Sequence, residues 1–182
     1  ELGCDVITIN NLPNGSNINK NCGAVNVHDL SKKVVENKAE IGFAFDGDGD
    51  RVIAVDETGK KIDGDNLIAI FASNLIKFKK LKKKIVVTTV MSNLGFEKFL
   101  KEKLKVRLIR KNVGDINVIT EMKKNNYILG GEESGHIILG EYSNSGDGIL
   151  AALKITEIIA IENIKASKLF DIYKQYPQFK SN

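Results

Sequence analysis

The sequence predicts an α/β fold built on a largely parallel sheet. Short runs rich in β-branched residues alternate with longer segments whose apolar residues recur at helical spacing. Strands interleaved with helices in this way are typical of layered α/β architecture. A hydrophobic fraction of 42% and a charged fraction of 27%, over 182 residues, are ordinary for a globular protein that buries a core.

The predicted elements follow from the local patterns in chain order. Seven short apolar or β-branched runs predict strands at residues 5–9, 41–45, 52–55, 85–90, 106–109, 127–129 and 136–139. Helical periodicity predicts helices at residues 30–38, 66–79, 95–103, 116–123, 149–161 and 168–176. Asp147 and Ser167 are the expected N-caps of the last two helices, and Pro177 marks the expected end of the final one.

We place a domain boundary near residues 60–63, after the strand–turn–strand pattern that ends there. This gives a first unit of residues 1–61, a second of residues 62–177, and the start of a linker at 178–182. Residues 1–5 read like a helix end followed by a strand, and the chain stops just after Pro177. We therefore expect a piece of a larger protein.

Composition bears on location and partners. No apolar run approaches the ~20 residues that cross a bilayer, and no basic-then-apolar leader is present, so we expect no membrane partner. Cys4 and Cys22 make no disulfide framework, which favours a reduced, cytoplasmic setting. The net charge of +4 is mostly lysine, densest at residues 77–84. Without an aromatic stacking set, that run predicts a solvated helix end and not a nucleic-acid partner.

The most informative segment is the acidic loop, residues 46–51, in which Asp46, Asp48 and Asp50 alternate with glycines and precede Arg51. Three carboxylates so close together repel unless a cation neutralises them, and glycines let the backbone bend so that they converge. Hard oxygen ligands at this density suit Mg²⁺ or Ca²⁺. A metal beside an arginine suits a phosphate group. We therefore predict that the three aspartates are metal ligands.

Three chemistries fit the acidic loop. An EF-hand matches the aspartate spacing, but it needs glycine where Arg51 stands and helices where strands are predicted. A phosphatase would use Asp46 as nucleophile and Asp48 as acid/base. In the third, the aspartates only hold Mg²⁺ and another group carries the phosphoryl.

Two further segments contain candidate functional residues. The glycine-rich loop, residues 130–136, offers Glu132 and Ser134 as an acceptor and a donor for sugar hydroxyls, and His136 for proton transfer. A plain hairpin with a structural histidine is an equally good interpretation of that segment. The Ser-Asn-Ser-Gly-Asp-Gly turn at residues 143–148 is expected mainly to cap the following helix, although its N–H groups could also face an anion.

Together these segments resemble the phosphohexomutase superfamily, in the right order along the whole chain. The matching stretches are residues 12–19, 46–51, 63–65, 91–95, 131–136 and 145–148, of which 91–95 resembles the glucosamine branch. The resemblance implies two related three-layer α/β units with mixed, largely parallel sheets: most of the second and all of the third of four domains. The first domain, with its phosphorylated serine, and the fourth, which grips substrate phosphate, would be absent.

The resemblance also implies a function. It implies an isomerase that interconverts glucosamine 6-phosphate and glucosamine 1-phosphate through a phosphoserine and a bisphosphate, toward UDP-N-acetylglucosamine. Mg²⁺ would be the cofactor, on Asp46, Asp48 and Asp50; Arg51 and His136 would be catalytic, and Glu132 and Ser134 would bind the phosphosugar. The whole protein could be a homodimer. Mannose- and glucose-type mutases share the metal loop and stay open as alternatives.

One position departs from the family pattern. Val113-Gly114-Asp115 is followed by Ile116, where the family usually has arginine, and Lys111 is the nearby cation that could substitute. Since no Ser-His-Asn segment of the catalytic-serine type is present, we expect the chain by itself to bind Mg²⁺ weakly and to lack mutase activity.

Overall fold

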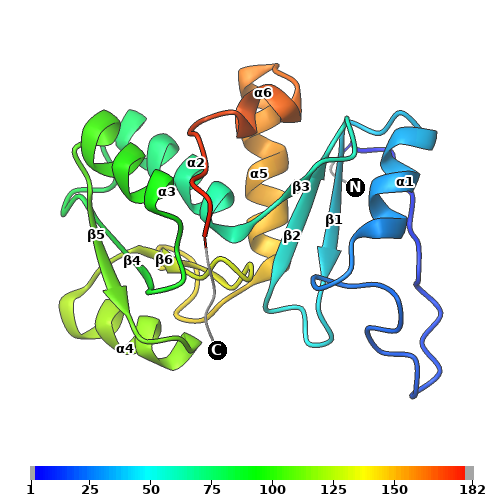
Figure 1. Ribbon diagram of the computed structural model, residues 1–182, viewed down its shortest axis with the longest axis horizontal. Helices are drawn as coiled ribbons and strands as arrows, with labels where there is room; N and C mark the ends of the chain where they lie inside the picture. The colour runs from blue at the N-terminus through cyan, green and yellow to red at the C-terminus, as the bar shows by residue number, and fades with distance from the viewer. Residues whose placement is uncertain (1–2, 179–182) are drawn as a thin grey trace.

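The first unit is a three-stranded antiparallel sheet between two helices. In the computed structural model, which describes residues 3–178, β1 (Ile41–Phe45), β2 (Val52–Asp56) and β3 (Lys61–Ile62) lie in the order β1-β2-β3. Short connections at residues 46–51 and 57–60 join them, and connections of this length allow only antiparallel pairing. Helix α1 (His28–Glu36) packs on one face and α5 (Gly148–Glu162) on the other (Figure 1).

Strand β2 is the most buried element of this unit. All five of its residues are buried, because β1 and β3 flank it and helices cover both faces. The close approach of α1 depends on Gly42 in β1, where a Cβ atom would lie 2.5 Å from Cγ2 of Val34. The acidic loop therefore extends from a rigid hairpin.

The second unit is built on a mixed sheet. Its strands are β4 (Ile85–Thr89), β5 (Arg107–Lys111), β6 (Leu129–Gly131) and β7 (Ile137–Leu139), in the order β5-β4-β6-β7. β4 is parallel to β5 and β6, whereas β7 is antiparallel to β6. The remaining elements are α2 (Gly64–Lys77), α3 (Leu94–Phe99), the π-helix η1 (Leu100–Leu104), α4 (Asp115–Asn125) and α6 (Ala166–Phe170).

Helices α2 and α4 cover opposite faces of this sheet. A Cβ on Gly130 would point at Met122 of α4, and one on the next residue, Gly131, would meet Ile68 of α2. Neighbouring strand residues face opposite sides, so β6 lies between the two helices. This is the three-layer arrangement that the sequence predicted.

The two units share one hydrophobic core. Its buried residues include Val52 and Ala54 from β2, Leu67 from α2 and Ile155 from α5. A smaller cluster of Val87, Val118, Met122 and Ile138 lies between α4 and the sheet. None of the described helices is long and apolar enough to span a membrane.

The predicted α/β fold class is confirmed, and most elements begin and end within a few residues of the expected positions. The second sheet is mixed and largely parallel as expected, whereas the sheet of the first unit is antiparallel because short turns join its strands. The strand predicted at residues 5–9 is wrong. Those residues have no regular structure, and Val6 and Ile7 are 75% and 60% exposed. A β-run becomes a strand only when another strand pairs with its backbone, and within residues 3–178 this segment has no such partner.

The last helix also differs from the prediction. It spans Ala166–Phe170, not residues 168–176, and Ser167 lies inside it and not at the N-cap. Glu57, from the β2–β3 turn, accepts the Ser167 N–H at 2.9 Å and the Ser167 hydroxyl. Farther on, Asn93 exchanges two hydrogen bonds with the backbone of Tyr176, which holds that stretch extended.

Asp147 is confirmed as the N-cap of α5, accepting the Leu150 N–H at 2.8 Å. Residues 1–2 of the expected helix end and 179–182 of the expected linker lie outside the described residues, whereas Gln178 donates to the Met91 carbonyl.

A buried carboxylate in α2 holds the loop that follows β4. Asp65 is fully buried and accepts the Ser92 hydroxyl at 2.8 Å and the Asn93 N–H at 2.6 Å. Burial raises the pKa of Asp65 to about 6, although these two hydrogen bonds favour the charged form. Asp65 thus ties α2 to residues 91–95, the stretch that resembles the glucosamine branch.

This burial predicts a pH-dependent stability. The pKa of Asp65 is higher in the folded chain than in the unfolded chain, so the folded chain holds this proton more tightly. The corresponding part of the unfolding free energy is present below about pH 4 and is lost as pH rises to about 6. Two pKa units correspond to about 3 kcal/mol. Relative to Asp65→Asn, which does not titrate, the unsubstituted chain should lose about that much unfolding free energy between pH 4 and pH 7.

Urea denaturation of both chains at pH 4, 5, 6 and 7 measures this difference, since all other carboxylates titrate in both. Asp5→Asn, at an exposed position, is the control and should track the unsubstituted chain. A difference between Asp65→Asn and the unsubstituted chain that stays constant with pH would contradict the assignment.

Candidate functional site

The acidic loop is the connection of the β1–β2 hairpin. Phe45 pairs with Val52, so residues 46–51 make the whole turn. Gly49 donates its N–H to the Asp46 carbonyl at 3.3 Å and has φ of +74°, a conformation that favours glycine. Asp46, Asp48 and Asp50 each offer one oxygen, and these oxygens lie within 4.8 Å of one another. The predicted ligands therefore converge.

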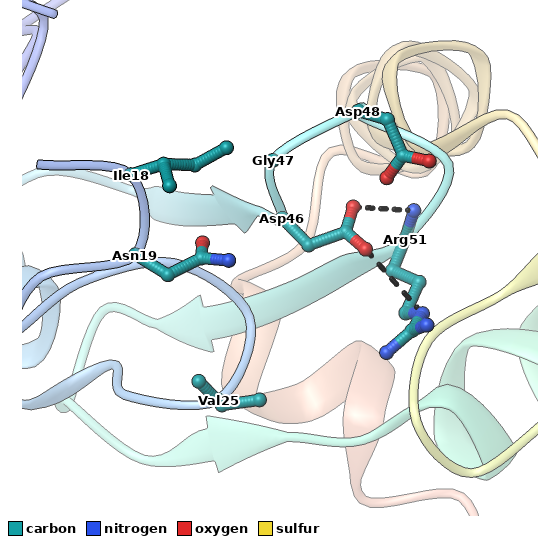
Figure 2. Close-up of a pocket in the computed structure, with 7 residues that line it drawn as sticks. All are labelled: Ile18, Asn19, Val25, Asp46, Gly47, Asp48 and Arg51. Carbon is teal, nitrogen blue, oxygen red and sulfur yellow. Dashed lines mark hydrogen bonds and ion pairs between the residues drawn. The ribbon is translucent and has the colours of Figure 1, made fainter. Parts of the chain in front are cut away.

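Arg51 neutralises part of this charge. Its backbone N–H donates to Oδ1 of Asp46 at 3.1 Å, and its Nε lies 3.4 Å from Oδ2 of Asp46 and 3.7 Å from Oδ1 of Asp50 (Figure 2 shows the contacts with Asp46). Three carboxylates and one guanidinium leave two negative charges at the loop. A divalent cation would balance them.

Asp50 gives the clearest test of a metal fit. Its Oδ1 is buried and has no hydrogen-bond partner among the described residues. Desolvation, together with the neighbouring Asp46, raises the pKa of Asp50 above its usual value. Oxygens that share one Mg²⁺ ion lie about 3 Å apart, since Mg–O distances are about 2.1 Å. The three converging carboxylate oxygens, one of them buried without a hydrogen-bond partner, are the hard donors that Mg²⁺ prefers, so these residues fit Mg²⁺.

Helix α5 and the glycine-rich loop hold the acidic loop and the start of β2 in place. Gly148, the first residue of α5, donates its N–H to the Gly49 carbonyl at 3.0 Å, and Val52 donates to the Gly135 carbonyl at 3.0 Å. A Cβ on Gly148 would lie 2.6 Å from the Arg51 carbonyl oxygen, and one on Gly135 would lie 2.2 Å from that of Val52. The glycines at these positions permit direct backbone contact between the two loops.

The glycine-rich loop makes a tight turn between β6 and β7. Gly135 donates to the Glu132 carbonyl at 3.0 Å, and Glu132 donates to the His136 carbonyl at 2.9 Å. Oε1 of the Glu132 side chain accepts the Gly114 N–H at 3.1 Å, and Ser134 is exposed. The two predicted sugar-binding residues thus lie on a turn that is bonded directly to the start of β2.

His136 lies behind the acidic loop. It is 3% exposed, its Nδ1 lies 2.9 Å from Oδ2 of Asp50, and its Nε2 accepts the Gly146 N–H at 3.2 Å. Both ring nitrogens are therefore occupied. In this arrangement His136 has no nitrogen available for the substrate contact or proton transfer expected from the sequence.

A cavity of about 390 Å³ adjoins the acidic loop (Figure 2). The loop lines one side with Asp46, Gly47, Asp48 and Arg51, and the other side is formed by Ile18, Asn19 and Val25. Sequence reasoning missed these last three residues. The signal available was the stretch 12–19, whose turn is tied by Asn17: its side chain accepts the Asn14 N–H and donates to the Leu12 carbonyl.

The position that departs from the family pattern is at the start of α4. Ile116 is 65% exposed, two residues after Gly114, which contacts Glu132. Lys111 pairs with Glu121 at 3.1 Å, so its ammonium group is already engaged within the second unit. The structure therefore gives no support to Lys111 as a substitute for the usual arginine.

The geometry separates the three chemistries. The acidic loop joins two strands, whereas an EF-hand loop joins two helices, so the EF-hand interpretation is wrong. Both oxygens of Asp46 contact Arg51, which leaves this side chain poorly placed as a nucleophile. A metal platform agrees best with the arrangement.

Comparisons with known proteins agree with this geometry. The α/β/α domain II of the phosphoglucomutase/phosphomannomutase family matches residues 1–59, and domain III matches residues 63–176. The chain is 46% identical over its full length to a phosphoglucosamine mutase of Caldicellulosiruptor saccharolyticus and 47% identical to one of Campylobacter fetus. It spans 40% and 41% of the length of these two relatives.

Solved structures give the same result. A phosphoglucomutase/phosphomannomutase family protein from Burkholderia thailandensis superposes with a TM-score of 0.73 at 26% identity, over 82% of this chain and 32% of that one. An Aspergillus fumigatus N-acetylphosphoglucosamine mutase, in complex with GlcNAc-6P and magnesium, shares the fold with a TM-score of 0.70 at 19% identity, over 90% of this chain and 42% of that one. Because both domain matches follow the family's order and together cover nearly all of the sequence, the chain belongs to the phosphoglucomutase/phosphomannomutase family.

Proposed function

We propose that the whole protein is a phosphoglucosamine mutase that interconverts glucosamine 6-phosphate and glucosamine 1-phosphate, with Mg²⁺ on Asp46, Asp48 and Asp50. The observation that carries the metal assignment is the convergence of the three carboxylates, with one buried Asp50 oxygen that has no hydrogen-bond partner in the described chain. The relatives named phosphoglucosamine mutase support this substrate over glucose and mannose phosphates.

The residues of this chain have distinct roles in the proposed reaction. A bound Mg²⁺ ion supplies positive charge that offsets the charge on the transferring phosphoryl group. Arg51 is 45% exposed and lines the cavity, so its guanidinium can pair with a phosphoryl oxygen there. Glu132 keeps one oxygen on Gly114 and offers the other to a sugar hydroxyl, while Ser134 donates to a second hydroxyl. The phosphoserine donor would come from outside this chain.

The proposal includes the cellular location and the oligomeric state of the whole protein. A cytoplasmic location is supported by Cys4 and Cys22, both of which are free thiols. A homodimer of the whole protein stays a prediction.

The first test measures the activity of the whole protein. With glucosamine 6-phosphate and Mg²⁺, phosphorus NMR should show conversion to the 1-phosphate and no release of inorganic phosphate. The glucosamine, glucose and mannose branches of the family share the metal loop, so we expect sugar contacts to decide between their substrates. The kcat/KM for glucosamine 6-phosphate should exceed the values for glucose and mannose phosphates by at least about tenfold. Release of inorganic phosphate as the main product would support the aspartyl phosphatase instead.

The chain of 182 residues serves as the matched control for that assay, since it carries the metal and sugar loops without a catalytic serine segment. It should show no turnover under the same conditions. Measurable mutase activity in the isolated chain would contradict the proposed division of roles.

The second test concerns the metal. Calorimetric titration of the chain should show one weak Mg²⁺ site, and Asp48→Asn should weaken it by at least about tenfold, because even outer-shell partners of a metal contribute that much. Asp48 is exposed, so this change should not unfold the hairpin. Asp29→Asn, an exposed carboxylate on α1, is the control. Equal Mg²⁺ affinity of the Asp48→Asn and Asp29→Asn variants would remove Asp48 from the ligand set.

A further inference from the structure

His136 lies between the acidic loop and the turn that precedes α5. It is nine-tenths or more buried, and it is the last residue of the glycine-rich loop. On one side its Nδ1 meets the Asp50 carboxylate at 2.9 Å, and on the other its Nε2 meets the Gly146 backbone N–H at 3.2 Å. An antiparallel β-bridge between Arg51 and His136 fixes the main chain of His136. Three independent contacts therefore determine where this ring lies.

The partners of the ring also determine its tautomer. A backbone N–H can only donate, so Nε2 must accept from Gly146 and must carry no proton. The proton of the neutral ring is then on Nδ1, and Nδ1–H donates to Oδ2 of Asp50. Reversing the tautomer would place two donors against each other at Gly146 and two acceptors against each other at Asp50.

This arrangement leaves Asp50 with one oxygen for a ligand. Oδ2 is engaged by His136, while Oδ1 is buried, has no hydrogen-bond partner within residues 3–178 and lies 3.7 Å from Nε of Arg51. Oδ1 is therefore the Asp50 oxygen left for a ligand shared with Asp46 and Asp48, each of which offers one oxygen within 4.8 Å. Histidine and carboxylate pairs behind metal ions act in this way, by fixing ligand orientation from the outer shell.

We infer that His136 is a positioning residue, which uses the Nδ1–H tautomer set by Gly146 to hold Asp50 as a one-oxygen metal ligand. The assignment rests on the proposed function for the identity of the metal. It also explains the glycine at residue 146: a Cβ there would lie 2.4 Å from Cε1 of the His136 ring, so any larger residue would push the ring toward Asp50. The 143–148 turn thus contributes to the metal site without touching the ion.

The first experiment reads the tautomer without any metal. The chain has two histidines, His28 and His136, so long-range proton–nitrogen correlation spectra of the ¹⁵N-labelled chain give two imidazole patterns, and His28→Asn assigns them. We expect His136 to show a protonated Nδ1 and an unprotonated Nε2. A protonated Nε2 would overturn the inference, whether or not the chain binds Mg²⁺.

The second experiment measures Mg²⁺ affinity by calorimetry in matched variants. His136→Leu removes both nitrogens and should weaken binding by about 10-fold or more, the range found for lost outer-shell partners. His136→Asn places an amide N–H near the position of Nδ1, and it should stay within about threefold of the unsubstituted chain. Equal affinities of all three folded chains, or equal losses in both variants, would overturn the positioning role.

Gly146→Ala provides a probe that leaves His136 itself unchanged. Since its Cβ displaces the ring, we expect Mg²⁺ affinity to fall several-fold and the His136 nitrogen signals to shift. Ser145→Ala, on the same turn, should change neither quantity. A Gly146→Ala chain with unaltered signals and affinity would contradict the inference. Failure of the unsubstituted chain to bind Mg²⁺ would count against the proposed function, whereas the tautomer measurement still tests the position of the ring.

Discussion

Repulsion among three carboxylates is the constraint that the surrounding structure has to satisfy. Asp46, Asp48 and Asp50 stand within one hairpin connection, and without restraint they would turn apart toward water. Arg51 compensates one charge, and backbone contacts from the second unit hold the loop's far side. The acidic turn is held by backbone contacts with residues that lie roughly a hundred positions later in the sequence. The proposed metal platform therefore depends on both units of the fold.

That constraint also explains the density of glycine around the site. Gly135 and Gly148 bring backbone against backbone at separations that no side chain permits. The resulting hydrogen bonds join the loop proposed to bind the sugar to the start of β2, and join α5 to the loop proposed to bind the metal. A substrate bound at one loop would therefore meet a metal whose position is fixed relative to it, and such fixed relative placement is what phosphoryl transfer requires of a protein.

Much of the fold follows from local sequence, and the exceptions share a physical cause. Apolar periodicity predicted the helices and nearly all the strands because burial of one face or both is a local property of the pattern. The extent of the last helix was not predictable, since Glu57 accepts from Ser167 in its first turn and Asn93 binds the backbone of Tyr176 beyond it. The strand expected at residues 5–9 failed for a related reason: the residues carry the propensity, but pairing depends on a neighbour.

The candidate site divides in the same way. Spacing alone indicated the aspartates and Arg51, because all four residues lie within one segment of six residues. The residues of the His136–Asp50 pair are 86 positions apart in the sequence, and no local sequence pattern predicts their contact. Likewise, Ile18 and Asn19 face the cavity only because their turn folds back over the hairpin.

The late position of helix α5 in the sequence has a consequence for folding during synthesis. It covers the sheet face behind the acidic loop, yet it begins at Gly148, long after β2 ends at Asp56. During synthesis at roughly 5–20 residues per second, the β1–β2 hairpin would leave the ribosome on the order of ten seconds before α5 has been synthesised. Throughout that interval an apolar sheet face is bare, which makes this stage the natural point for chaperone capture.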